Sequence, residues 1–161
     1  MEIRRVRPEE WKAHREIRLR ALGTDPDAFG ATLAEALTED DAAWQRRADR
    51  PDGVAFVAVA DEARFVGMAN GGPAPDRPEF AAVYGMWVAP EARGQGLGGA
   101  LLDAVEGWAR EAGYDHIGLG VTTTNEPAIR LYASHGYADL GQQLPLRDGT
   151  DLVIQLMGKP L

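Results

Sequence analysis

A glycine-dense turn between an apolar segment and an apolar-faced helix constrains this chain more than any other feature of its sequence. Residues 83–102 read VYGMWVAPEARGQGLGGALL, so an apolar run ends at Val88 and four glycines stand among residues 94–99. Glycine leaves backbone N–H groups open to a ligand because it has no side chain to block them. A helix that begins here adds unpaired N–H donors and a partial positive charge. The stretch therefore predicts a phosphate-binding turn, with a plain glycine-rich turn as the simpler alternative.

The charge of the chain argues against nucleic acid as a partner. Among its 161 residues, 25 are acidic and 17 are basic, which gives a formal net charge of -8 at pH 7. An acidic surface repels the phosphates of nucleic acids and suits a cationic or amine substrate.

The length allows one domain with a hydrophobic core, and we expect residues 1–161 to form it.

The sequence also lacks cysteine and long apolar segments. Without cysteine, disulfides, thiolate metal sites and a cysteine nucleophile are excluded. The apolar run at residues 54–60 has the length of a strand and is too short to cross a bilayer. The first ten residues contain no apolar core typical of a signal peptide. We expect a cytoplasmic protein with no membrane segment and no metal.

The order of apolar patterns predicts an α/β (α+β) chain with about seven strands and about four helices. The expected strands cover residues 3–7, 54–60, 65–69, 80–88, 117–121, 137–146 and 152–157. The expected helices begin at Pro8, within 38–50, at Leu97 and at Pro127, and an alternative start for the second lies near Ala31. The histidines His14 and His135 are interpreted as surface or helix-end residues.

Two established phosphate motifs fit the glycine turn poorly. A P-loop requires Lys and Ser or Thr after its glycines, where this chain has Gly98-Gly99-Ala100. The dinucleotide fingerprint G-x-G-x-x-G is formally present in residues 94–99, and Asp115 follows at a suitable distance for a ribose contact. That fingerprint, however, begins where its strand ends, whereas five residues separate Val88 from Gly94. A dinucleotide-binding oxidoreductase is therefore the less favoured alternative.

A third pattern matches the turn and the segment before it as they stand. Residues 93–98, RGQGLG, match R/Q-x-x-G-x-G/A, and residues 125–137, NEPAIRLYASHGY, match N-x-x-A-x-x-x-Y-x-x-x-G-F with Tyr137 in place of Phe. Both motifs, together with residues 86–91 (MWVAPE), resemble the GNAT acyltransferase superfamily. The order of elements over nearly the whole chain is also similar to that fold.

The resemblance implies a fold and a cofactor. The fold is a mixed, largely antiparallel sheet of about seven strands, splayed between the fourth strand, ending at Val88, and the fifth, beginning near Ile117. Acetyl-CoA would enter the splay, with its pantetheine paired to the backbone of Met86 and Val88 and its pyrophosphate on the glycine turn. The implied cofactor-binding residues are Met86, Trp87, Val88, Arg93, Gly94, Gln95, Gly96, Leu97, Gly98, Asn125, Ala128 and Tyr132.

The resemblance also implies a reaction, transfer of the acetyl group to a primary amine of a small molecule or a protein. In the family, the tyrosine that matches Tyr132 protonates the departing thiolate, and a phenol near the thioester suits that role. The absence of cysteine removes an acetyl-cysteine route and favours direct attack in a ternary complex. A catalytically silent acyl-CoA-binding regulatory module on the same fold is an alternative.

The acceptor side of the site carries no motif. In such folds the pocket lies between the first two helices and the last strand pair, and Phe29 could equally belong to the core. The candidate lining residues are Arg18, Phe29, Glu35, Gln142 and Gln143. The candidates for a general base, chosen by residue type alone, are Glu35, Glu39, Glu126 and His116. A homodimer is expected only from the habit of the family.

Overall fold

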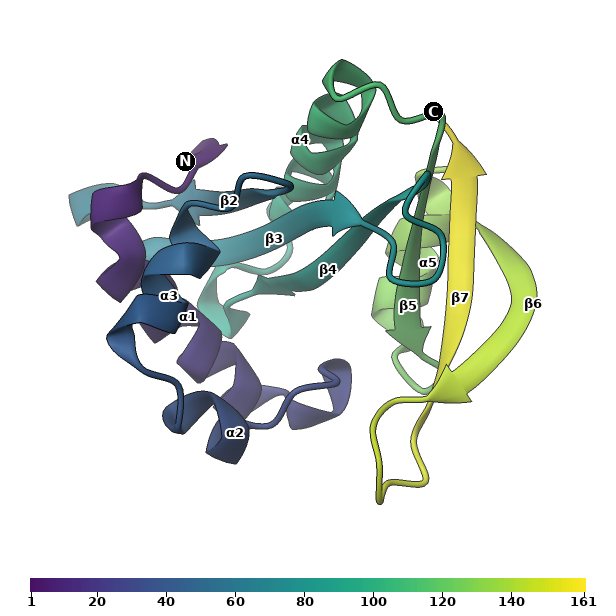
Figure 1. Ribbon diagram of the computed structural model, residues 1–161, viewed down its shortest axis with the longest axis horizontal. Helices are drawn as coiled ribbons and strands as arrows, with labels where there is room; N and C mark the ends of the chain where they lie inside the picture. Colours follow the sequence, from purple (N-terminus) through teal and green to yellow (C-terminus); the bar gives the residue numbers. More distant parts are fainter.

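A seven-stranded mixed sheet runs through the computed structural model, which describes residues 1–161 (Figure 1). The strand order is β1-β2-β3-β4-β5-β7-β6, and only the β4–β5 pair is parallel. The strands are β1 (Glu2–Arg5), β2 (Val54–Val59), β3 (Phe65–Pro73), β4 (Ala81–Val88), β5 (His116–Thr122), β6 (Ala138–Pro145) and β7 (Val153–Pro160). The helices are α1 (Trp11–Thr24), α2 (Leu33–Leu37), α3 (Asp41–Ala48), α4 (Leu97–Glu111) and α5 (Glu126–Ser134). The predicted mixed, largely antiparallel sheet is confirmed.

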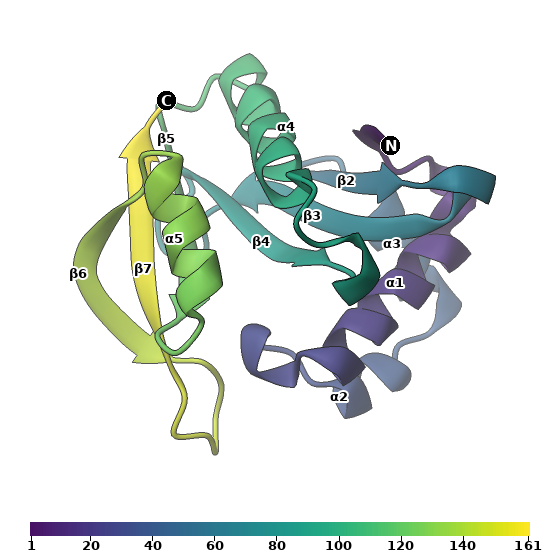
Figure 2. The same ribbon diagram turned by 180° about the vertical axis from the view of Figure 1, so that it is seen from behind.

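The sheet opens between β4 and β5, as the sequence predicted. These strands pair only where Ala81 lies opposite Ile117 and Ala82 opposite Gly118. Beyond this short contact the two strands diverge, and β5, β7 and β6 form a second half at a steep angle to β1–β4 (Figure 2). The edge of β4 that faces β5 therefore has no partner strand from Val83 to Val88. Its backbone groups are available to a ligand, except the Val88 carbonyl, which accepts from Arg93 Nε.

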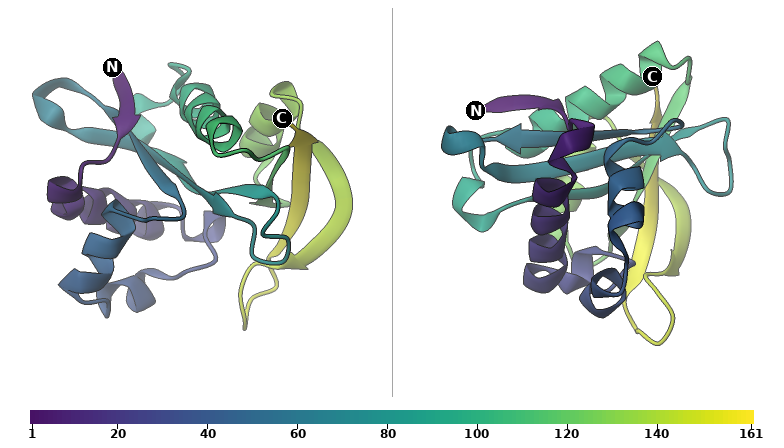
Figure 3. Two further views of the ribbon diagram at one scale, coloured as in Figure 1. Left: turned by 45° about the horizontal axis from the view of Figure 1, so that its top comes forward. Right: turned by 60° about the vertical axis from the view of Figure 1, so that its left-hand side comes forward.

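Helices cover both faces of the first half of the sheet. Helix α4 packs on one face of β2–β4, and α1, α2 and α3 lie on the opposite face (Figure 3). The apolar positions of α4 recur at helical spacing, so they form one stripe that enters the core. Its fully buried members are Leu101, Leu102, Val105 and Ala109. None of the helices is long and apolar enough to cross a membrane.

The region between α1 and β2 differs from the sequence prediction in its detail. One helix was expected within residues 38–50, whereas α2 and α3 share the segment from Leu33 to Ala48. Each has its own N-cap, because Thr32 Oγ1 accepts from Glu35 N at 3.2 Å and Asp40 Oδ1 accepts from Ala43 N at 2.9 Å. The alternative boundary near Ala31 thus marks a helix of its own.

The interpretation of His14 as a surface or helix-end residue was wrong. The side chain is only 3% exposed because it lies on the same face of α1 as Ile17 and Ala21, which enter the core. His135 does stand at a helix end, as the C-cap of α5.

Candidate functional site

A cleft of about 690 Å³ lies where the two halves of the sheet separate. It is lined by the connection between α1 and α2, the end of β4, the glycine turn, the start of α4 and the segment from β5 to α5. Eleven of the twelve predicted cofactor-binding residues line it: Met86, Trp87, Val88, Arg93, Gly94, Gly96, Leu97, Gly98, Asn125, Ala128 and Tyr132. The twelfth, Gln95, is exposed beside the cleft and does not line it. The two sequence motifs, about thirty residues apart, therefore meet at one place.

The glycine turn presents a row of unpaired amides. Gly94 and Gly96 have φ angles of 78° and 79°, and a Cβ built on either would meet nothing within 4 Å. The first amide of this region to find an acceptor is that of Ala100, which donates to the Gly96 carbonyl at 3.1 Å. The N–H groups of residues 94–99 have no acceptor within the protein. Six consecutive free donors at a helix N-terminus fit a pyrophosphate group.

The Arg93 side chain is held at the edge of the turn. Its Nε donates to the Val88 carbonyl at 2.9 Å, and its Nη2 donates to Asp25 Oδ2 at 2.8 Å. The same carboxylate accepts from Trp87 Nε1 at 2.7 Å. Burial acts to raise the pKa of Asp25, but the hydrogen bonds from Trp87 and Arg93 outweigh it and lower the pKa. Asp25 therefore fastens the end of β4 and the start of the turn to the end of α1.

The connection between α1 and α2 also bridges the two halves of the sheet. The Asp27 carbonyl accepts from Thr122 Oγ1 of β5 at 2.6 Å. Arg147, between β6 and β7, donates from Nη1 to the Phe29 carbonyl at 2.7 Å and to the Pro26 carbonyl at 3.3 Å. Sequence reasoning missed these residues, although turn chemistry at residues 24–30 was visible. Of these residues, Pro26, Asp27 and Thr122 line the cleft.

Asn125 and Tyr132 occupy the opposite wall, on α5. Asn125 caps this helix, because its Oδ1 accepts from Ala128 N at 3.3 Å, and its Nδ2 remains available to a ligand. Tyr132 is 8% exposed and contacts the edge of the Tyr137 ring, with 6.0 Å between ring centroids. Burial raises the pKa of Tyr132 to about 12. The phenol thus keeps its proton at neutral pH and can donate it.

The predicted acceptor-side residues do not line this cleft. Phe29 is buried in the core, and Gln142 is exposed on β6. Glu35 is exposed and bonds Thr32 Oγ1 at 3.0 Å as part of the α2 cap. Arg18 lies against β4, with Nη1 3.4 Å from the position that a Cβ on Gly85 would take.

The remaining candidates for a general base also lie outside the cleft. Glu39 is bonded to Arg47 at 2.6 Å, and Glu126 is exposed on the first turn of α5, 3.8 Å from Arg130. His116 is exposed at the start of β5 and its ring packs on Phe80, with centroids 4.8 Å apart. The structure therefore brings none of the predicted bases to Tyr132.

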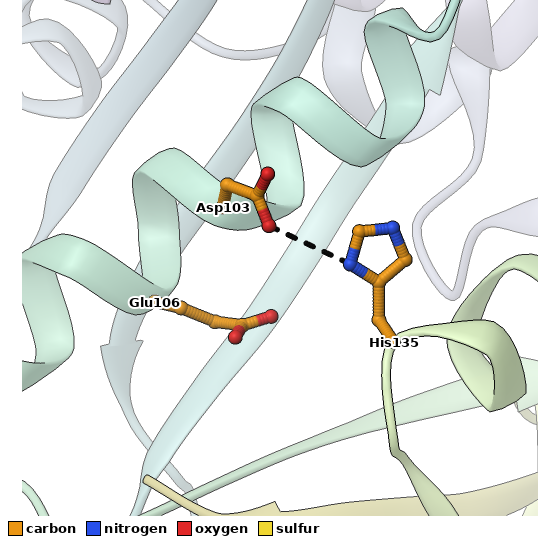
Figure 4. A group of neighbouring side chains, drawn as sticks. All are labelled: Asp103, Glu106 and His135. Atoms are coloured by element: carbon orange, nitrogen blue, oxygen red, sulfur yellow. Dashed lines mark ion pairs between the residues drawn. The ribbon is translucent and has the colours of Figure 1, made fainter.

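A second group of polar residues lies between α4 and the end of α5. Asp103, Glu106 and His135 place one potential metal-ligand atom each within 4.8 Å of one another, and His135 Nδ1 is 3.5 Å from Asp103 Oδ1 (Figure 4). Glu106 is buried, and it is already paired with Lys159 Nζ at 2.6 Å and accepts from the Tyr137 hydroxyl at 3.1 Å. The charge of this carboxylate is therefore balanced by Lys159 of β7, and the pair joins α4 to β7 inside the protein.

Comparison with known proteins agrees with the cleft and its motifs. Residues 11–137 match the model of the acetyltransferase (GNAT) family. A streptothricin acetyltransferase from Streptomyces lavendulae is 38% identical over 102 residues, which cover 56% of this chain and 52% of that protein. The matches span only 36 to 52% of the length of this relative and of three mycothiol acetyltransferases.

Two solved structures resemble the whole chain. A ribosomal-protein-alanine N-acetyltransferase from Brucella melitensis has a TM-score of 0.80 and 24% identity, with 100% of both chains covered. A structure of yncA from Salmonella typhimurium with its cofactor acetyl-CoA has a TM-score of 0.78 and 23% identity, covering 100% of this chain and 94% of that one. At these identities the likeness concerns the fold.

Proposed function

Because the chain belongs to the GNAT acetyltransferase family, we propose that it transfers the acetyl group of acetyl-CoA to a primary amine. One observation carries the proposal: the glycine turn, which has six free backbone amides, and a buried, protonated phenol line the same cleft. The amides of residues 94–99 would hold the pyrophosphate, and the unpaired edge of β4 would hold the pantetheine as an added strand. Acetyl-CoA, when bound, supplies the thioester that the amine attacks.

Tyr132 would act as the general acid. The amine nitrogen forms a bond to the acetyl carbon, and the bond from that carbon to sulfur breaks, with its electron pair leaving on the sulfur. The Tyr132 hydroxyl donates its proton to this sulfur, the proton lost by the amine passes to water, and water returns a proton to the Tyr132 phenolate. Since burial raises the pKa of Tyr132 to about 12, the phenol is protonated at neutral pH. Direct attack needs no covalent enzyme intermediate, and the chain has no cysteine to form one.

A small-molecule amine is the acceptor class that the relatives support. Streptothricin acetyltransferase is 38% identical over its matched region, and an aminoglycoside N(6')-acetyltransferase from Klebsiella aerogenes is 32% identical over 98 residues. The acidic balance of the chain, at -8, favours the approach of a cationic amine. Homodimer formation stays a prediction.

Release of free CoA thiol with a panel of amines tests the proposal, with Tyr132→Phe as the main variant. We expect single-turnover acetyl transfer to fall about 10²–10⁴-fold, the range of general-acid catalysis, while the Kd for acetyl-CoA stays unchanged. Tyr114→Phe is the matched control, because Tyr114 packs on Trp108 outside the cleft and should leave the rate unchanged. Equal single-turnover rates in the wild type and Tyr132→Phe would refute the role of Tyr132.

Thermal-shift titration, combined with this assay, separates the alternatives. Thermal stabilisation by acetyl-CoA without thiol release on any amine would identify a silent acyl-CoA-binding module. Stabilisation by NADH and not by acetyl-CoA would identify a dinucleotide-binding protein.

A further inference from the structure

Arg18 on α1 is a largely buried arginine without a partner. Its guanidinium reaches β4 at Gly85, yet no side chain or carbonyl of the protein forms a hydrogen bond or an ion pair with it, and its Nε is fully buried. A buried guanidinium without an acceptor is costly, so proteins normally pair it. The Nη nitrogens are not fully buried and have no acceptor in the protein, so an anionic group from outside the chain can bind them.

The neighbours of Arg18 are also incompletely satisfied. Buried side-chain atoms without any hydrogen bond occur only three times in the protein: Arg18 Nε, His14 Nδ1 and Glu39 Oε2. His14 lies one helical turn before Arg18 on α1, and Glu39 uses its other oxygen for Arg47, at 2.6 Å. These three buried atoms without a hydrogen bond belong to one cluster between α1 and α3, formed by His14, Arg18, Glu39 and Arg47.

This cluster carries a net positive charge in an acidic protein. Burial, together with the charges of Arg18 and Arg47, lowers the pKa of His14 to about 4, so that His14 is neutral. Burial and Arg47 lower the pKa of Arg18 to about 10, against a smaller opposite effect of Glu39. Two arginines against one glutamate leave one positive charge, which matches a single carboxylate better than a doubly charged phosphate.

The cluster lies near two cavities, although neither Arg18 nor His14 lines them. A pocket of about 350 Å³ adjoins it, lined by Glu39, Ala43 and the arginines Arg46, Arg47 and Arg50. On the other side, Gly85 precedes Met86, whose side chain lines the cleft. Gly85 has a φ of 59° and no room for a Cβ, so the guanidinium can lie directly over the strand.

We propose that the acetyl acceptor is an amine that also carries a carboxylate, which Arg18 binds while the amino group reaches the cleft beside Met86. The planar carboxylate accepts two parallel N–H bonds from a guanidinium. This inference rests on the proposed acetyl transfer and names the class of its substrate.

Matched pairs of amines test the proposal: β-alanine against β-alaninamide, and lysine against lysinamide, each with acetyl-CoA. We expect kcat/KM to favour the carboxylate of each pair by about 10-fold or more, as for a hydrogen bond to a charged group. Arg18→Gln should abolish this preference. Arg15→Gln, on the same helix but paired with Asp41 at 3.6 Å, should keep it.

A stability measurement excludes a folding defect as the cause. Because Arg18→Gln removes a buried charge that nothing compensates, its melting temperature without substrate should equal or exceed that of the wild type. Turnover of the amides as fast as of the carboxylates, or an unchanged preference in Arg18→Gln, would overturn the inference and leave the proposed acetyl transfer intact. Failure of every amine to release CoA thiol would instead overturn the proposed function, and this inference with it.

Discussion

Replacing Asp25 with asparagine should loosen the connection between α1, the end of β4 and the glycine turn. The Asp25 carboxylate accepts from Trp87 Nε1 at 2.7 Å and from Arg93 Nη2 at 2.8 Å on the same oxygen. Hydrogen bonds to a charged group contribute about 1.5–3 kcal/mol each. The side chains of Asp25 and Arg93 are 37% and 49% exposed, so solvent screening reduces the contribution of this ion pair.

We therefore expect Asp25→Asn to lower the free energy of unfolding at pH 7 by about 1–3 kcal/mol in total. For a chain of this size, that corresponds to a melting temperature lower by about 2–10 °C. Thermal unfolding followed by circular dichroism measures the difference. Asp27→Asn is the matched control, because the Asp27 side chain forms no hydrogen bond and only its carbonyl is used.

The effect should depend on pH in a defined direction. The folded-state pKa of Asp25 is lowered below the unfolded value of about 3.9. Its stabilisation is thus complete above the unfolded pKa and disappears as the pH falls through the folded pKa. The gap between the wild type and Asp25→Asn should stay constant from pH 7 to about pH 5 and close at lower pH. If Asp25→Asn unfolds like Asp27→Asn at pH 7, the argument for this connection is refuted.

Three further substitutions test the packing around the site. Gly85→Ala should destabilise the protein by about 1–3 kcal/mol, because its φ is 59° and the new Cβ would lie 2.7 Å from Asn70 Nδ2; chemical denaturation measures this. Gly107→Ala, in the same assay, should raise stability by up to about 1 kcal/mol, since this glycine lies within α4 with nothing within 4 Å of its Cβ position. Glu106→Gln should cost about 3 kcal/mol or more by leaving Lys159 without its partner, and adding Lys159→Met should recover part of the loss. Additive effects in that double variant would contradict the pairing.

The sequence could predict those parts of the fold that depend on local patterns. The spacing of Leu97, Leu101, Leu102 and Val105 predicted a helix with one apolar face, and all four are buried. The strand before the turn is confirmed as well, and so is the splay between β4 and β5 that the family resemblance implied. These features follow from periodicity and from the two motifs, which occupy short stretches of chain.

The errors have local causes too. Helix α2 has only five residues, too few for a hydrophobic period to be visible. His14 looked like a surface residue because histidine is polar, although it shares a face with the apolar Ile17. The position of a residue on a helix face predicts its burial better than its residue type does.

Contacts between distant segments could not be predicted. Asp25 meets Trp87 and Arg93 across 62 and 68 residues of sequence, and no local pattern pairs them. The unpartnered state of Arg18 is likewise a property of packing between α1, α3 and β4. The sequence could therefore identify the residues expected to hold the cofactor more completely than those around the acceptor.

Amide hydrogen exchange with and without acetyl-CoA tests the central claim most directly. The N–H groups of residues 94–99 have no acceptor within the protein, so without ligand they should exchange rapidly. Saturating acetyl-CoA should slow the exchange of these amides and of those along the free edge of β4, while NADH should leave them unchanged. Slower exchange elsewhere in the chain, with residues 94–99 as fast as before, would contradict the account.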